Sequence, residues 1–236
     1  AYTIGMDEKV IPFITSANVA CGFHAGDPLV MQRTVALCKQ SSAAVGAHPG
    51  FPDLQGFGRR QMKLTPAEAK ACVQYQIGAL KAFCDAAGVP LHHVKPHGAL
   101  YNMAGKDRAL ADAICAAVKE SAPGAVLLAL SGSEMVKAAQ AIGLPVANEV
   151  FADRGYRPDG SLVPRGTPGA MIEDEDEAIA RVIRMVTEGK VTANDGTDIA
   201  IQADSVCVHG DGPKALAFVE KIGAALQAAG VELKAF

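Results

Sequence analysis

The sequence predicts an α/β protein built as a (β/α) barrel. Short apolar runs alternate along the chain with longer stretches of helical periodicity, a pattern typical of βαβ units and a parallel sheet. Within the runs, small or polar residues alternate with bulkier apolar residues. A closed barrel explains this asymmetry because its inner face converges on an axis with little room, whereas an open sheet covered by helices is bulky on both faces.

The length and composition fit one large domain. The chain has 236 residues, half of them hydrophobic, and a formal net charge of -3. This charge, without a basic patch, argues against a nucleic-acid partner. No apolar run approaches the roughly 18 residues that a membrane helix needs. The six cysteines include no CxxC pair, which favours reduced thiols and a cytoplasmic protein.

Six apolar runs are the expected strands. In chain order they read ANVACG, AAVGA, LHHVK, AVLLAL, VANEV and SVCVH. A candidate helix follows each run, at 28–40, 66–87, 107–120, 133–142, 174–188 and 213–229. The second helix has the clearest start, because Thr65, Pro66 and Glu68 are spaced as a capping box with proline in the first turn.

One stretch departs from the alternation. Residues 190–203 read as two short strands around Asn194, Asp195 and Gly196, which is a typical hairpin turn sequence. We therefore expect a single barrel domain over residues 1–236 with an appended β-hairpin at 190–203.

Polar residues recur where the expected strands end. Four of the six histidines end a run and are followed by glycine within two residues, and they lie on the small-residue face of their strands. Barrel enzymes carry their chemistry at the carboxyl ends of the strands. We therefore expect one site at the mouth of the barrel, formed by Asn18, His24, His48, Lys95, His97, Glu149 and His209. Cys207 shares the inner face, where we expect it to pack as a small hydrophobic residue.

Two long loops are expected at the same mouth, one after His48 and one after Glu149. They carry Arg59, Arg60, Arg154, Arg157 and Arg165. Guanidinium groups suit carboxylates and phosphates, and we expect Arg154 and Arg165 to bind substrate together with Asn18. The sequence contains no GxxxxGK[ST] phosphate loop, and no HxH or HExxH motif identifies a bound metal.

Five segments, taken in order, resemble the LamB/YcsF family. They read TSANVACGFHAGDP, GAHPGFPDLQGFGRR, HHVKPHGALYN, EVFADRGYRPDGSLVPR and VCVHGD. The resemblance covers nearly the whole chain and implies an irregular, seven-stranded (β/α) barrel of the glycoside hydrolase/deacetylase type. Family members usually begin with a strand like DLNxDxGExFG, which is absent here. We therefore expect the first barrel strand to be missing, and with it at least one carboxylate of the site.

The resemblance also implies an activity, that of the A subunit of an ATP-dependent 5-oxoprolinase. Such an enzyme cleaves 5-oxo-L-proline to L-glutamate, coupled to hydrolysis of ATP with magnesium, and works with subunits B and C. The catalytic residues would be His24, His48, Lys95, His97, Glu149 and His209. Lys95 would meet developing negative charge, and a histidine or Glu149 would move protons.

Two other functions stay open. One is a stand-alone metal-dependent deacetylase or amidohydrolase, in which an aspartate from the missing strand and two histidines, such as His24 and His48, would hold one metal ion. The other is a non-catalytic substrate-binding subunit whose chemistry lies in its partners. Metal analysis of the pure protein tests the first, and substitution of Lys95 or His97 tests the second.

Overall fold

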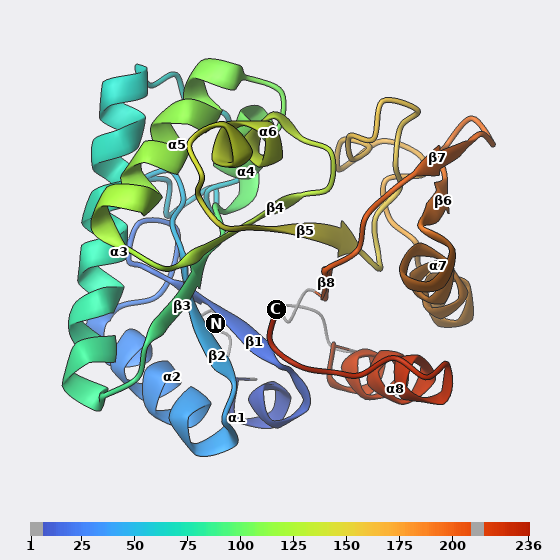
Figure 1. Ribbon diagram of the computed structural model, residues 1–236, viewed down its shortest axis with the longest axis horizontal. Helices are drawn as coiled ribbons and strands as arrows, with labels where there is room; N and C mark the ends of the chain where they lie inside the picture. Colours follow the sequence, from blue (N-terminus) through green and yellow to red (C-terminus); the bar gives the residue numbers. More distant parts are fainter. Residues whose placement is uncertain (1–6, 209–214) are drawn as a thin grey trace.

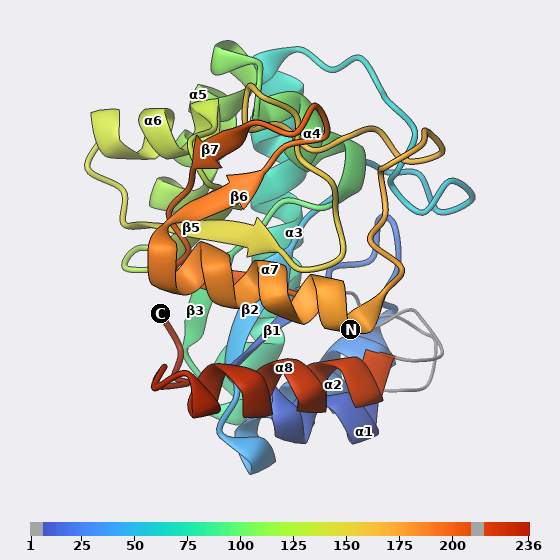
Figure 2. The same ribbon diagram turned by 90° about the vertical axis from the view of Figure 1, so that its right-hand side faces the viewer.

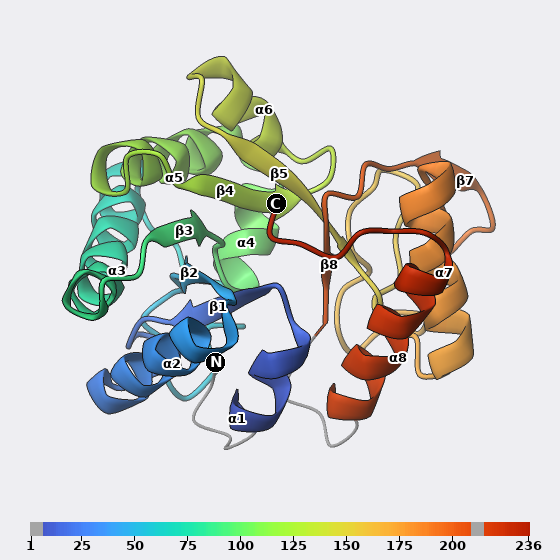
Figure 3. The same ribbon diagram turned by 60° about the horizontal axis from the view of Figure 1, so that its bottom comes forward.

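The computed structural model describes residues 7–208 and 215–236, and its centre is one curled parallel sheet. The sheet contains β1 (Ser16–Ala20), β2 (Ala44–His48), β3 (Leu91–Val94), β4 (Val126–Leu130), β5 (Val146–Phe151) and β8 (Ser205–Cys207). The strands are ordered as in the chain, and every neighbouring pair is parallel. Figure 3 shows the sheet curling around a central space. This confirms the α/β, barrel-type fold.

The curled sheet has two edges in the described part of the chain. It contains six strands, and the edge strands β1 and β8 do not pair with each other. The family resemblance implies seven strands. The seventh strand stays a prediction.

Helices cover the outside of the sheet (Figure 1). The long ones are α2 (Pro28–Ser41), α3 (Pro66–Ala87), α5 (Arg108–Ser121), α6 (Glu134–Ala141), α7 (Glu175–Glu188) and α8 (Ala215–Ala228). Shorter elements are α1 (Asp7–Val10), the 3₁₀ helix Ile11–Phe13 and α4 (Gly98–Ala104). Among the described residues, no helix combines the length and hydrophobicity needed to cross a lipid bilayer.

Helix α3 shows how local sequence positions these elements. The side chain of Thr65 accepts a hydrogen bond from the backbone N–H of Glu68, and the Glu68 carboxylate accepts one from the backbone N–H of Thr65. This is the predicted capping box. The helix ends at Gly88, whose φ of 64° suits glycine. Its inner face buries Ile77 and Leu80, and full burial of such a side chain stabilises the fold by about 1.5–3 kcal/mol.

The chain after β5 builds the other side of the molecule. Strands β6 (Lys190–Thr192) and β7 (Asp198–Ala200) pair antiparallel as a hairpin. Figure 2 shows α7 lying between this hairpin and α8, and α7 packs against both β6 and α8. A small second core joins α7, α8 and the start of the long loop after β5, through Ala152, Val182, Ile222 and Leu226.

Candidate active site

The polar side chains singled out by the sequence gather at the carboxyl ends of the strands. His48 is the last residue of β2, Lys95 follows β3 directly, and Glu149 lies near the end of β5. His97 comes immediately before α4. Backbone hydrogen bonds extend the β2–β3 pairing past the strands, from the N–H of Lys95 to the carbonyl of Ala47. Because the strands are parallel, their carboxyl ends meet at one end of the curled sheet and bring these side chains together.

The barrel interior contains a cavity of about 840 Å³. This volume lies in the range of small-molecule sites. Seven of the sequence-predicted site residues line it: Asn18, His48, Lys95, His97, Glu149, Arg154 and Arg165. The lining therefore includes two oppositely charged side chains, those of Lys95 and Glu149, and the imidazole rings of His48 and His97.

Lys95 and Glu149 form a buried ion pair at this cavity. The ammonium Nζ of Lys95 lies 2.5 Å from Oε1 of Glu149, and the two side chains are 7 % and 1 % exposed. Burial alone would lower the pKa of Lys95, but the neighbouring Cys207 and Glu149 outweigh it and raise the pKa above its usual value. An unpaired ammonium would be costly at this buried position, so Lys95 can stay charged here because Glu149 pairs with it.

Two residues without a predicted chemical role complete this charge cluster. The hydroxyl of Tyr101 donates to Oε2 of Glu149 at 2.7 Å, and Nζ of Lys95 donates to Sγ of Cys207 at 3.2 Å. Burial raises the pKa of the Cys207 thiol to about 12, although the neighbouring Lys95 opposes this shift. Sequence reasoning missed Tyr101 because it did not predict α4, which carries this residue inward; the apolar spacing of ALYN after His97 was the available signal.

His48 and His97 form the second cluster, and backbone carbonyls orient both rings. Nδ1 of His48 lies 2.6 Å from the carbonyl oxygen of Lys95, and Nε2 of His97 lies 2.7 Å from the carbonyl oxygen of Phe57. The remaining nitrogens, Nε2 of His48 and Nδ1 of His97, face each other at 3.0 Å. Burial, together with the neighbouring His97 and Lys95, holds the pKa of His48 well below its usual value.

His24 joins the imidazole cluster from a loop. The sequence predicted a strand running as far as His24, but β1 ends at Ala20. The following loop stacks the ring of His24 on that of His97, with centroids 3.8 Å apart and planes 5° apart. Gly58, at φ +63°, lies against both rings, and a Cβ there would come within 2.9 Å of each side chain. Burial, followed by the charge of His97, lowers the pKa of His24 to about 2.

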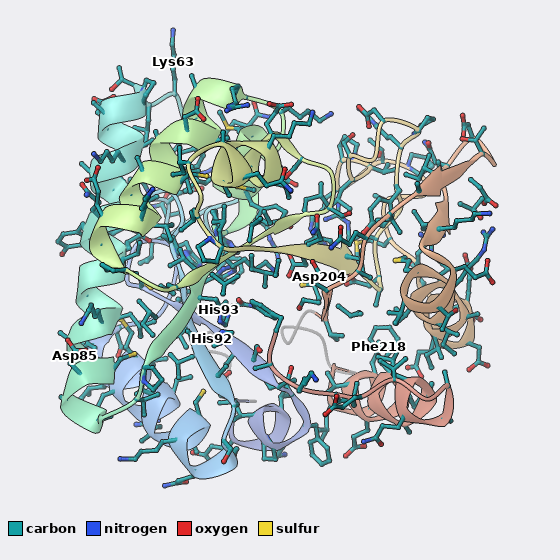
Figure 4. All side chains as sticks on the ribbon, viewed as in Figure 1. Lys63, Asp85, His92, His93, Asp204 and Phe218 are labelled. Carbon is teal, nitrogen blue, oxygen red and sulfur yellow. The ribbon has the colours of Figure 1, made fainter. Side chains whose placement is uncertain are left out.

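Asn18 lies deeper in the barrel than the two clusters. It pairs in register with Gly46, whereas His48 pairs with Ala20 near the mouth. The amide oxygen of Asn18 lies 3.0 Å from Nε2 of His93, which projects from β3 (Figure 4). Asn18 lines the cavity, but the structure gives it a protein partner in His93.

The two arginines expected to bind substrate differ in their surroundings. Arg154 is buried, and its guanidinium donates to the carbonyl oxygens of Ala170 and Val163, which fixes the long loop after β5. Arg165 is exposed at the rim of the cavity, where its Nη1 contacts Sδ of Met171 at 3.2 Å. His209, expected at the same mouth, lies outside the described residues.

Comparison with known proteins gives a consistent result. The LamB/YcsF family matches residues 1–236. The chain is similar to the A subunit of 5-oxoprolinase from Clostridium beijerinckii, with 63 % identity over 99 % of this chain and 91 % of that protein. It is 55 % identical to the A subunit of 5-oxoprolinase from Bacillus subtilis, over 100 % of this chain and 91 % of that one.

A solved structure shares the fold. The crystal structure of the lactam utilization protein from Thermus thermophilus superposes with a TM-score of 0.92 at 51 % identity. The match covers 100 % of this chain and 94 % of that one. The matched family and these similarities agree with the motifs at the strand ends, and the chain belongs to the LamB/YcsF family.

Proposed function

We propose that this chain is the A subunit of a 5-oxoprolinase and cleaves the amide bond of the lactam 5-oxo-L-proline to give L-glutamate. Its relatives are named as A subunits of 5-oxoprolinase, and its structural neighbour is a lactam utilization protein. One observation supports placing the reaction in the barrel cavity: the buried Lys95–Glu149 pair lies at the strand ends and lines that cavity.

The reaction adds one water molecule across the ring amide. The hydroxyl group joins the carbonyl carbon, the C–N bond breaks, and a proton passes to the nitrogen. A lactam carbonyl is a poor electrophile, and transfer of the γ-phosphoryl group of ATP to its oxygen activates it. Attack by this water and cleavage of the C–N bond leave the phosphoryl group on the new carboxyl group. A second water molecule then displaces it as inorganic phosphate, which couples the two hydrolyses and leaves L-glutamate and ADP as the other products.

Lys95 is the proposed stabiliser of developing charge in this reaction. Its ammonium faces the cavity and is oriented by Glu149, so it can meet the lactam oxygen or its phosphoryl group without rearranging. Tyr101 holds the other carboxylate oxygen of Glu149 and so fixes the geometry of the pair. Loss of one such preorganised donor typically lowers turnover by about 10² to 10³-fold.

The histidine cluster is proposed to position the attacking water, and Glu149 or His209 to move protons. His48 and His97 line the same cavity as Lys95, and His24 packs on His97 behind them. His209 remains a predicted member of this group. Asn18 and Arg165, at opposite depths of the cavity, are the proposed contacts of the substrate's polar groups.

The nucleotide and the partner subunits belong to the proposal as well. The sequence has no GxxxxGK[ST] phosphate loop, so ATP–magnesium is proposed to bind in another way or at a site shared with subunits B and C. The six cysteines are all free thiols, as is common in the reducing cytoplasm, where we place the enzyme.

Reconstitution tests the proposal. The chain is incubated with 5-oxoproline and ATP–magnesium, with and without subunits B and C, while glutamate and inorganic phosphate are measured. We expect the two products in equal amounts, and only when all subunits are present. Release of glutamate by the chain alone without ATP, or undiminished turnover by subunits B and C without this chain, would contradict it.

A further inference from the structure

We propose that His48 Nε2 and His97 Nδ1 are ligands of one divalent transition-metal ion of the zinc type, with His24 as a third ligand. The three imidazoles each offer a nitrogen, and these nitrogens lie within 4.8 Å of one another in a buried cluster. The inference goes beyond the proposed function, because it concerns ion binding and its test does not use turnover.

The first step is the tautomer of each ring in the facing pair. A carbonyl oxygen only accepts hydrogen bonds, so the nitrogen that contacts it carries the proton. Nδ1–H of His48 therefore donates to Lys95 O, and Nε2–H of His97 donates to Phe57 O. In neutral rings this leaves Nε2 of His48 and Nδ1 of His97 as the nitrogens with lone pairs.

The second step is that these two lone pairs converge. The two nitrogens are 3.0 Å apart, a separation that is repulsive unless a proton or a cation lies between them. Two nitrogens bound to one tetrahedral zinc ion at about 2.0–2.1 Å lie roughly 3.3 Å apart. A separation larger by a few tenths of an ångström would accommodate the ion without changing either carbonyl contact.

The surroundings match those of protein metal sites. A metal-bound histidine almost always donates its other N–H to a carboxylate, a water or a backbone carbonyl, and both rings do so here. A proton shared between His48 and His97 would need only their two nitrogens. The third imidazole, that of His24, therefore favours a metal ion over a shared proton. His24 stacks parallel to His97, so its ring has to rotate before one of its nitrogens points at the ion.

The donor set defines the class of ion. Three imidazoles without oxygen ligands suit zinc, cobalt, nickel, copper or iron, and they do not suit the hard ions magnesium and calcium. His48 and His97 also line the cavity. From the described residues an ion there would have three protein ligands, and a fourth position toward the cavity could then bind a water molecule or a carbonyl or carboxylate oxygen.

The test measures ion binding directly. The untagged chain is stripped with a chelator, dialysed and titrated with Zn²⁺ by calorimetry and with Co²⁺ by visible absorption. We expect one ion per chain and cobalt bands typical of four-coordinate nitrogen-rich sites. In His48→Gln and in His97→Gln, affinity should fall by more than the roughly 100-fold that loss of a metal's outer-shell partner can cause. His92→Gln, which changes a histidine outside the cluster, should bind as the unchanged chain does.

A second measurement needs no variant and so does not depend on variant folding. Nitrogen-15 NMR of the histidine-labelled chain reports which nitrogen of each ring carries the proton. We expect Nδ1–H for His48 and Nε2–H for His97, with the resonances of the opposite nitrogens shifting when Zn²⁺ is added. The proposal would be overturned if far less than one ion bound per chain, or if the folded His48→Gln and His97→Gln variants bound Zn²⁺ as tightly as the unchanged chain. It would also be overturned if the histidine resonances did not shift on addition of Zn²⁺.

Discussion

Residues 91–97, LHHVKPH, run through the barrel interior from the end away from the mouth to the mouth itself. The polar side chains at the two ends of this segment have different surroundings. At the mouth, Lys95 and His97 line the cavity and contact other polar side chains. At the opposite end, His92 and His93 pack edge-on against Phe236, with ring centroids 5.3 and 5.2 Å from that of Phe236. The same residue type therefore serves a site at one end and packing at the other.

Burial alone does not distinguish the two ends. His93 is fully buried, and burial, followed by His92 and Lys95, lowers its pKa to about 3. His97 is almost as buried. The difference lies in the contacts: His93 is held by Asn18 and packs against Gly46, whereas His97 faces a second imidazole beside a charged pair. A histidine at a strand end indicates a site only when a cavity and other chemical groups meet it.

The largest stability effect is expected at the mouth, in Glu149→Gln. This substitution leaves the Lys95 ammonium buried without its counter-charge, which typically costs about 3–5 kcal/mol. Urea unfolding measures the loss. The control is Glu120→Gln, which breaks an exposed ion pair with Lys70 and should cost about 1 kcal/mol or less. An equal loss in the free energy of unfolding in the two variants would show that the buried pair contributes no more to stability than the exposed pair.

The next effect is expected at the opposite end, in Gly46→Ala. A Cβ at Gly46 would come within 2.0 Å of Nε2 of His93, whose ring is enclosed by its neighbours. Overpacking of this kind costs about 1–3 kcal/mol. Gly78→Ala, on an exposed position of α3 with nothing within 4 Å, should instead stabilise the protein by about 1 kcal/mol. A Gly46→Ala protein as stable as the parent chain would refute the tight packing around His93.

The smallest effect is expected for Phe236→Ala, again at the end away from the mouth. The ring contacts with His92 and His93 are lost, and aromatic pairs of this kind contribute about 0.5–1.5 kcal/mol beyond their buried area. We expect a modest fall in the urea midpoint and an unchanged kcat in the assembled complex. A fall in kcat as large as that of a mouth variant would erase the functional distinction between the two ends.

Much of the fold could be predicted because its signals are local. The capping box of α3 and the Pro28 start of α2 depend on neighbouring residues, and the structure places both helices where the sequence predicted. Helix α4 was not predicted, and the local signal for it is weak because no side chain caps its start. That omission also hid Tyr101, whose role depends on a contact with Glu149 far along the chain.

The candidate site could be predicted as a set of residues more readily than as a geometry. Strand alternation pointed Lys95 and Glu149 inward, but it could not show that they touch. The place of Arg154 in a long loop at the mouth predicted that it binds substrate, but it could not show that the guanidinium donates to carbonyl oxygens of its own loop. The stacking of His24 on His97 depends on a loop conformation that no periodicity encodes.

The central claim is that the ammonium of Lys95 acts on the substrate at the mouth, and Lys95→Met tests it most directly. The substitution keeps most of the side-chain volume and removes the charge, and Lys81→Met, which breaks an exposed pair with Asp85, is the matched control. In the complex assembled with subunits B and C, we expect Lys95→Met to fold and its kcat to fall at least about 100-fold, while Lys81→Met is unaffected. A folded Lys95→Met complex with near-normal ATP-dependent glutamate formation would contradict the claim.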